Sequence, residues 1–220
     1  MKQNINSINK IFERAANNYK YRWGIQKIEK LLKKNINFIS EDILCKLGFL
    51  YDHLALKQKK INLKKFYENK AIKLYQQALK INPKSHRATW GIGRVWWHRK
   101  NKRAISYATR AYRLKKINDG KIGLYAQNIG LIYEAIGNYK KAEYWLLRGM
   151  KENKKDFGSY INLVVFYRLI KNFNKAKKCA VKLKKLYDKE SISFKKTLWG
   201  KKIQEIIQNA DKSLKKKKSS

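Results

Sequence analysis

Residues 129–150 read IGLIYEAIGNYKKAEYWLLRGM, and they contain two short amphipathic runs on either side of Gly137-Asn138. Apolar side chains recur at helical spacing in both runs, and the intervening glycine can end the first helix. The stretch therefore predicts a hairpin of two helices. The small residues Gly130 and Ala142 allow the two backbones to approach closely, and so short a hairpin needs stacked neighbours to bury its apolar faces.

The same pattern recurs along the chain. In the first run of each repeat, a small residue or valine precedes an aromatic residue by three positions, as in Gly48/Tyr51, Gly93/Trp96, Gly130/Tyr133 and Val164/Tyr167. In the second run, alanines recur at spacings of 33, 38 and 34 residues, and another small or apolar residue follows each alanine seven positions later. The alanines are Ala71, Ala104, Ala142 and Ala176, and the later residues are Ala78, Ala111, Gly149 and Leu183. In these residues the sequence resembles the tetratricopeptide repeat (TPR) family, whose unit is about 34 residues long.

The resemblance implies an all-α fold, a right-handed solenoid of about five helix-turn-helix hairpins closed by a C-terminal capping helix. We predict a single solenoid over residues 1–210, followed by a basic, disordered tail at 211–220. The predicted repeats are 5–38, 41–84, 85–118, 123–156 and 157–190, and the capping helix is 191–210.

Local signals place several helix ends. Ser7 is expected to cap the first helix, which is expected to include Tyr19. Extra residues in the second repeat are lysine-rich and lack proline and glycine, so we expect lengthened helices that meet near Ile61-Asn62. Turns are expected at Lys100-Asn101 and at Asn118-Asp119-Gly120.

The charge balance is far from neutral. The chain has 54 Lys and Arg against 15 Asp and Glu, which gives a formal net charge of +39. Abundant lysine and asparagine match the codon usage of an AT-rich genome, but that bias does not explain the scarcity of glutamate. Such a surface attracts polyanions, among them RNA, acidic proteins and anionic lipid headgroups. Which of these uses the charge, or whether any does, stays open at this stage.

The sequence does not predict an enzyme. The histidines His53, His86 and His98 lack partners at metal-ligand spacing, and no phosphate-binding or nucleophile motif occurs. We therefore expect no catalytic residue, metal or cofactor. Two cysteines, Cys45 and Cys179, lie in different repeats, so a reducing compartment is expected. The cytoplasm is the first choice and an organellar matrix the alternative, and no segment approaches the roughly 20 apolar residues of a membrane span.

The resemblance also predicts where a partner binds. In the TPR family the first helices line a concave groove, and this carries over to one helical face in the third repeat: Arg87, Trp90, Arg94, Trp97 and His98. Arginines can grip carboxylate or phosphate, and indoles offer flat faces. Trp96 is expected in the core, with Trp97 facing the groove. The corresponding positions elsewhere are Asp52, His53, Gln127, Asn128, Leu131, Glu134, Asn162, Val165 and Arg168.

Two hypotheses about function follow. The first is a non-catalytic protein–protein interaction scaffold that holds a partner protein or peptide, preferably acidic, in the groove. The second is an RNA- or ribosome-associated protein that contacts phosphates through its basic surface. Asn128 and Asn162 either bind a peptide backbone or are surface residues of an asparagine-rich chain.

Overall fold

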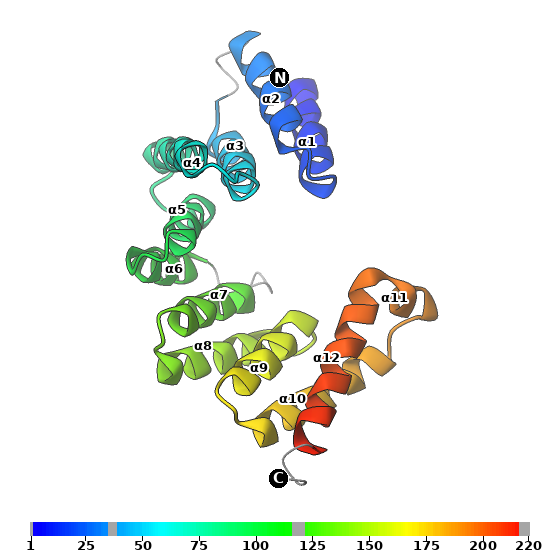
Figure 1. Cartoon of the computed structure of the whole chain (residues 1–220). Coiled ribbons are helices and arrows are strands. Elements are labelled where there is room, and N and C mark those ends of the chain that lie inside the picture. Colours follow the sequence, from blue (N-terminus) through cyan, green and yellow to red (C-terminus); the bar gives the residue numbers. More distant parts are fainter. Residues whose placement is uncertain (1, 35–38, 116–121, 216–220) are drawn as a thin grey trace. The chain divides into compact units, whose positions relative to one another are not determined.

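The computed structural model describes residues 2–34, 39–115 and 122–215, with side chains described for 5–34, 39–115 and 122–210. Within these ranges the chain forms twelve α-helices and no strand, so the predicted all-α helical-repeat class is confirmed (Figure 1). The chain divides into two compact units, Met1–Leu114 and Lys115–Ser220. A single continuous solenoid and its right-handed turn stay predictions.

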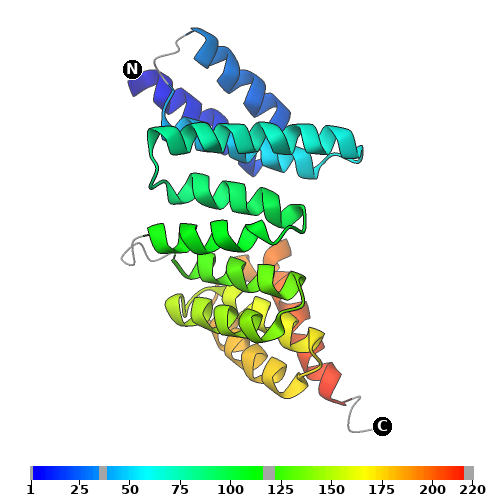
Figure 2. The same ribbon diagram turned by 90° about the vertical axis from the view of Figure 1, so that its left-hand side faces the viewer.

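Unit 1 consists of three stacked hairpins. The first pairs α1 (Lys2–Asn17) with α2 (Tyr21–Lys34), the second α3 (Glu41–Leu56) with α4 (Ile61–Ile81), and the third α5 (His86–His98) with α6 (Arg103–Leu114). Neighbouring hairpins meet through α2 on α3 and through α5 on both α3 and α4. Figure 2 shows α3 and α4 lying side by side along their lengths.

Unit 2 contains two hairpins and a terminal helix pair. The hairpins are α7 (Ile122–Ala135) with α8 (Tyr139–Glu152), and α9 (Phe157–Leu169) with α10 (Phe173–Asp188). They are followed by the short α11 (Ile192–Lys196) and by α12 (Leu198–Lys215), which packs on α9 and α10. Ile203 and Ile207 of α12 are buried there, so α12 closes the end of this unit.

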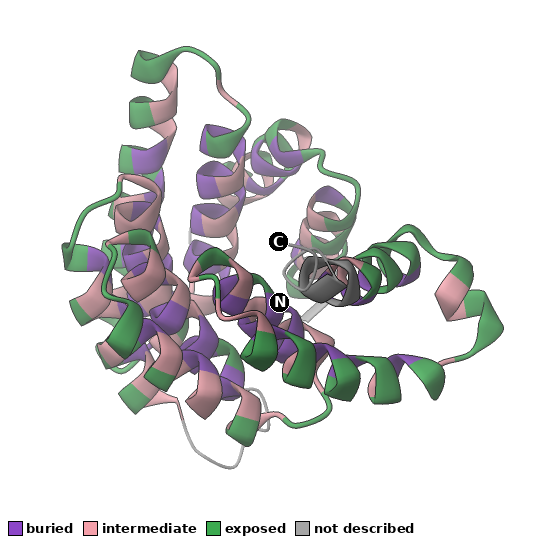
Figure 3. Ribbon diagram, turned by 60° about the horizontal axis from the view of Figure 1, so that its bottom comes forward, coloured by how far each residue is buried: buried purple, intermediate pink, exposed green. Residues whose placement is uncertain are grey.

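The predicted small residues lie at close helix–helix contacts. Ala71, Ala104 and Ala142 are fully buried, and Ala176 is 1% exposed, which confirms the repeat register. Glycines serve the same purpose in the α7–α8 hairpin, where a Cβ on Gly149 would lie 2.8 Å from the carbonyl oxygen of Gly123. Buried residues accordingly face neighbouring helices, while exposed residues follow the outer faces (Figure 3).

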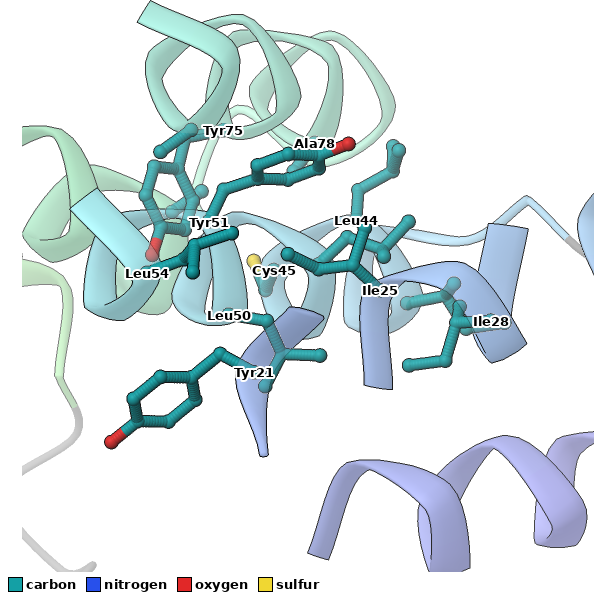
Figure 4. Close-up of a cluster of buried hydrophobic side chains, with 14 of the residues drawn as sticks. Tyr21, Ile25, Ile28, Leu44, Cys45, Leu50, Tyr51, Leu54, Tyr75 and Ala78 are labelled. Atoms are coloured by element: carbon teal, nitrogen blue, oxygen red, sulfur yellow. The ribbon is translucent and has the colours of Figure 1, made fainter. Parts of the chain in front are cut away.

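Tyr75 of α4 shows how a large side chain uses the space that small residues leave. Its ring is 2% exposed and occupies the positions where side chains of Gly48 in α3 and Gly91 in α5 would otherwise begin. Figure 4 shows Tyr75 in the same cluster as Tyr21 and Ile25 of α2. One aromatic ring thereby joins the second and third hairpins, because two glycines admit it.

Three local predictions are wrong or incomplete. α1 begins at Lys2, so Ser7 lies inside the helix and is not its cap; Tyr19 lies beyond the end of the helix and is 69% exposed. The capping helix is two helices, because Thr197 adopts an extended conformation with ψ at 159°. α12 then continues to Lys215, so the first five residues of the predicted tail are helical.

The lengthened helix of the second repeat is confirmed. α4 has 21 residues and begins at Ile61, and α3 ends at Leu56, so the two helices meet slightly earlier than predicted. The predicted turn at Asn118-Asp119-Gly120 lies outside the described residues.

Four of the five hairpin turns, all but the one between α3 and α4, contain a residue with positive φ, which is unfavourable for most side chains. The residues with positive φ, one in each of these turns, are Tyr19 (56°), Lys100 (53°), Gly137 (78°) and Lys171 (57°). In the last three turns an asparagine follows, and its side-chain oxygen accepts a hydrogen bond from a backbone N–H of the next helix. Positive φ suits glycine and is unfavourable for residues with a Cβ.

Paired substitutions in the two turns of unit 2 test this conformation. Gly137→Ala should lower the free energy of unfolding by about 1 kcal/mol because of the positive φ, since no atom lies within 4 Å of the new Cβ. Lys171→Gly should raise the free energy of unfolding by roughly 0.5 kcal/mol for the same reason. Denaturant unfolding measures both, and changes of the same sign would contradict the assignment of these turns.

Candidate functional site

The five residues predicted in the third repeat all lie on α5. Ser85 caps this helix by accepting a hydrogen bond from the backbone N–H of Ala88 at 3.1 Å. Ile92 and Val95 are buried on one side of the helix. On its other side Arg87 is exposed, whereas Trp90, Arg94, Trp97 and His98 are half-buried. Whether this side of α5 binds a partner stays a prediction.

Arg94 is already engaged by a carboxylate of this chain. Its Nε lies 2.5 Å from Oδ2 of Asp52, a residue of α3 that is fully buried. The guanidinium also lies 4.9 Å from the centre of the Phe49 ring and 3.5 Å from the hydroxyl of Tyr75. The predicted groove position of Asp52 is thus wrong, because this carboxylate is buried between two helices and Arg94 neutralises it.

Arg87 also binds acids of this chain. Its Nη1 donates to Asp42 at 2.6 Å and its Nη2 to Glu41 at 3.0 Å, both in the first turn of α3. Burial acts to raise the pKa of Glu41, but hydrogen bonds from Ser85 and Cys45 and the charge of Arg87 hold that pKa below its usual value. Arg87 therefore ties the starts of α3 and α5 together while about half of its side chain stays exposed.

The aromatic side chains of α5 form a half-buried strip. The rings of Trp90 and Trp97 lie 6.5 Å apart between centres, and His98 stacks on Trp97 at 5.7 Å. Trp96 packs against the core of unit 1, as predicted, and is half-buried with the guanidinium groups of Arg99 and Arg103 over its ring. The indoles keep exposed surface that a ligand can contact.

A cavity of about 430 Å³ adjoins His98 where α4 meets the turn after α5. It is lined by Ile61, Lys64, Lys65, Glu68, Asn69, His98, Arg99 and Lys100. Glu68 is 2% exposed and accepts a hydrogen bond from Nε of Arg99 at 2.8 Å. The added turns of α4 thus supply the carboxylate that holds Arg99 in place.

On the face of α3 that adjoins Arg94, His53 was predicted as a groove position, and its neighbours on this face were not. Asp42, Lys46, Phe49 and His53 follow one another at helical spacing on this face. Phe49 stacks on His53 with ring centres 3.8 Å apart and contacts the ring of Phe12 in α1 at 5.5 Å. A signal was available, because aligning Gly48 with Gly93 places Asp42 at the position of Arg87, and oppositely charged residues at equivalent positions of neighbouring helices can pair.

In unit 2 the predicted residues lie on α7 and α9. Nδ2 of Asn162 donates to Oε1 of Gln127 at 2.9 Å, and Gln127 itself is 2% exposed. Gln127 also donates to Asp156, which caps α9, and to Ser159. Asn128 and Arg168 are half-buried and pair with no other described side chain. The amides therefore fasten α7 to α9 and leave part of their surface open.

Exposed apolar residues accompany these amides. Leu124 is 54% exposed, Val165 46% and Leu169 53%, and Leu131 is half-buried against the core of this unit. Helical spacing places Leu124, Asn128 and Leu131 on one side of α7, and Asn162, Val165 and Leu169 on one side of α9. We call these six residues the α7–α9 face. These six residues are uncharged, and the predicted groove positions Glu134 and Arg168 follow them, three positions after Leu131 and Val165.

The ionisable side chains were also compared with what metal binding and nucleophilic catalysis require. Among the described residues, no group of three His, Cys, Asp or Glu side chains could hold a metal ion. Burial and a hydrogen bond to Glu41 raise the pKa of the Cys45 thiol to about 12, so that thiol stays protonated at neutral pH. The described helices include none that is long and apolar enough to cross a membrane.

The fold is that of tetratricopeptide repeat proteins. The chain is similar to the type IV pilus biogenesis factor PilW, with a TM-score of 0.66 and 20% identity over 96% of this chain and 89% of PilW. It is also similar to TTC0263, a thermophilic TPR protein of Thermus thermophilus, with a TM-score of 0.63 and 14% identity over 94% and 98% of the two chains.

A third similar structure is that of the MamA protein, with a TM-score of 0.58 and 19% identity over 86% of this chain and 94% of MamA. No protein-family model and no curated protein matches the sequence. Identities this low establish the shared fold alone, so the function has to be argued from the surfaces of this chain.

Removing one partner of the Asp52–Arg94 pair should be far more costly than replacing both. Asp52→Ala leaves a guanidinium largely buried without a carboxylate and should lower the free energy of unfolding by about 3–5 kcal/mol. The double variant Asp52→Leu with Arg94→Met removes both charges and should be considerably more stable than Asp52→Ala. Denaturant unfolding measures the free energy of unfolding of each variant. If the loss in the double variant equals the sum of the losses in the two single variants, the two residues are not coupled.

The two histidines near Arg94 should make stability depend on pH. Burial lowers the pKa of His53, and the positive charge of Arg94 lowers it further. Burial also lowers the pKa of His98. The negative charge of Asp52 opposes this decrease, and the positive charges of Arg94 and Lys64 add to it. The unfolded chain, with histidine pKa values of about 6.5, then binds more protons, so stability should decrease as the pH falls from about 7 to 5.

The double variant His53→Gln, His98→Gln should flatten this dependence. Because the pKa values of Glu41 and Asp42 are lowered, their contributions are lost only at more acidic pH. Unfolding free energies measured at several pH values test this. An unchanged slope in the double variant would contradict the assignment.

Proposed function

We propose that the chain is a non-catalytic scaffold that binds a segment of a partner protein on the α7–α9 face. The observation that supports this is the combination of three exposed apolar residues, Leu124, Val165 and Leu169, with the amides of Asn128 and Asn162. Apolar contacts give a peptide affinity, and amides can bind its backbone N–H and C=O groups. Charges, which would favour a nucleic acid, are missing from this face.

The amides offer complementary hydrogen bonds to a peptide backbone. Nδ2 of Asn162 uses one of its two N–H groups to donate to Gln127, so its second N–H and its carbonyl oxygen are available to a partner. Asn128 is half-buried and pairs with no other described side chain, so it can offer both a donor and an acceptor. The hydrogen bond that fixes Asn162 also reduces the entropy lost when a peptide binds.

In unit 1, the aromatic strip of Trp90 and Trp97 is a second contact surface for a partner. Arg87 and Arg94 contribute differently from what the sequence suggested, since acids of this chain already neutralise them. An acidic partner is then favoured by the net charge of +39 as a whole, which speeds association and weakens with salt. We therefore propose a partner segment with apolar anchors and acidic flanks.

A second candidate function rests on α10. Its exposed side bears Lys177, Lys178, Lys182 and Lys185 around a shallow hollow of about 590 Å³ that Asn174 and Val181 complete. No acidic side chain lines this hollow. A stripe of lysines along one helix suits the phosphates of RNA, and such binding depends steeply on salt. This keeps an RNA- or ribosome-associated role as the alternative.

The compartment stays a prediction. Cys45 and Cys179 are both free thiols, which suits the reducing cytoplasm expected from the sequence. We also propose no cofactor and no catalytic residue, because the buried carboxylates Asp52 and Glu68 are paired with arginines.

Substitutions on the α7–α9 face test the proposed scaffold. Val165→Glu with Leu169→Glu places two charges on exposed positions, so folding should be unchanged while partner capture at about 200 mM salt is lost. The matched control is Val181→Glu on α10, which is similarly exposed at 45% and should keep the partner. Partners are identified by pull-down followed by mass spectrometry.

RNA binding would give the opposite pattern. Recovery of RNA that collapses between about 50 and 200 mM salt, and that Lys178→Glu with Lys182→Glu abolishes, would favour the alternative. Equal partner capture by the wild type and the α7–α9 variant would contradict the proposed face.

A further inference from the structure

The corner where α11 meets α12 exposes three large apolar side chains. Leu198 is 88% exposed, Ile192 73% and Trp199 50%. All three lie within eight consecutive residues, on either side of the break at Thr197 (Figure 1). Large apolar residues exposed singly are ordinary, but a cluster at one point of the surface indicates an interaction site.

The corner is held firmly by its own contacts. Ser191 caps α11 by accepting a hydrogen bond from the N–H of Phe194, whose ring stacks on Phe157 of α9 at 5.7 Å between centres. At the break, the Thr197 hydroxyl donates to the carbonyl of Phe194 at 2.6 Å and accepts from the N–H of Gly200 at 3.0 Å. The exposed side chains therefore project from an ordered scaffold.

Positive charge surrounds the apolar side chains. Residues 184–202 contain seven lysines against Asp188 and Glu190, a net charge of +5. Lys184 pairs with Asp188, Lys195 donates to the backbone carbonyl of Asp188, and Lys202 pairs with Glu205. Lys196 and Lys201 flank the apolar residues, are exposed, and pair with no acidic side chain among the described residues. Their charges are available to an external anion.

We propose that this corner docks on an anionic membrane surface. Leu198 and Ile192 would enter the boundary between headgroups and acyl chains, Trp199 would lie at headgroup level, and the lysines would contact lipid phosphates. Binding is peripheral, since only the corner enters the lipid. It goes beyond partner binding on the α7–α9 face and does not depend on it.

The chemistry favours lipid over other polyanions. RNA would stack its bases on flat rings, yet two of the three exposed side chains are aliphatic and have no ring to offer. A projecting apolar corner with flanking lysines fits an anionic lipid surface, because the headgroups carry negative charge and the acyl chains beneath them are apolar and fluid.

Vesicle sedimentation with the full chain tests the proposal. The wild type should bind phosphatidylcholine vesicles containing about one-third phosphatidylglycerol and should not bind pure phosphatidylcholine. Leu198→Ser with Trp199→Ser should weaken binding by about tenfold or more, since the insertion of two large side chains is lost. Each of Lys196→Gln and Lys201→Gln should weaken it by about fivefold. Melting curves confirm that the variants are folded.

Phe66→Ser with Lys70→Gln on α4 is the matched control, because it removes an exposed large apolar residue and an exposed lysine from the other unit. It should bind vesicles within about twofold of the wild type. Vesicle binding by Leu198→Ser with Trp199→Ser at wild-type affinity would overturn the proposal and leave general charge attraction as its cause.

Two further outcomes would also overturn it. A wild-type dimer that dissociates in the Leu198→Ser, Trp199→Ser variant, without vesicle binding, would make the corner an interface between copies of the chain. Single-stranded RNA bound through the corner in place of vesicles would make it a nucleic-acid site. Partner capture by the α7–α9 face should be intact in all corner variants, so failure of this proposal is distinguishable from failure of the proposed scaffold.

Discussion

The ion pair between Asp52 and Arg94 illustrates the constraint on which the rest of the structure depends. The chain has 54 basic residues and only 15 acidic ones, so each carboxylate that pairs with an arginine or lysine must lie where that pair stabilises the fold. Where an acidic side chain forms an ion pair with a residue outside its own helix, that residue usually belongs to a neighbouring hairpin. Glu41 and Asp42 bind Arg87, Glu68 binds Arg99, and Glu143 binds both Lys175 and the hydroxyl of Tyr167. Carboxylates used in this way stabilise the stacking of hairpins and leave the outer surface positive.

The same constraint separates the binding properties of the two units. In unit 1, Arg87 and Arg94 are paired with acidic residues of this chain. The groups of α5 that are left to bind a ligand are therefore its indole rings. In unit 2, the six residues of the α7–α9 face carry no charge. The buried Gln127 beside them fastens α7 to α9 by hydrogen bonds to the Asn162 amide and to the Asp156 carboxylate. A surface without charge selects a partner by shape and apolar contact, while the rest of the chain increases the rate at which acidic partners arrive.

The repeat register could be predicted from sequence because small residues at fixed spacing leave few alternatives. Ala71, Ala104, Ala142 and Ala176 are all buried where the spacing placed them. The contents of the binding surface were harder to predict, because periodicity tells which side of a helix a residue occupies and not which residue of another helix it meets. Asp52 was therefore predicted as a ligand-binding position although it is buried against Arg94.

Helix ends were the least predictable feature. The break at Thr197 has no proline. Its side-chain hydroxyl donates a hydrogen bond to the carbonyl of Phe194 and accepts one from the N–H of Gly200. The turn at Lys171 likewise uses positive φ without glycine, because the asparagine that follows supplies a cap for the next helix. The equivalent turn at Lys100-Asn101 was predicted, and the structure confirms it. Local sequence preference is overridden in these places by contacts made nearby in the folded chain.

The two proposed surfaces of unit 2 are connected by one helix. α9 begins at Phe157, on which Phe194 of the corner stacks, and ends at Leu169 of the α7–α9 face. Twelve residues of helix separate them, about 18 Å at the usual rise per residue. The α7–α9 face is neutral and the corner is basic with apolar side chains at its tip, so the two surfaces select different ligands. Because the α7–α9 face and the corner have no residue in common, a peptide on one and a lipid surface at the other do not compete for the same side chains.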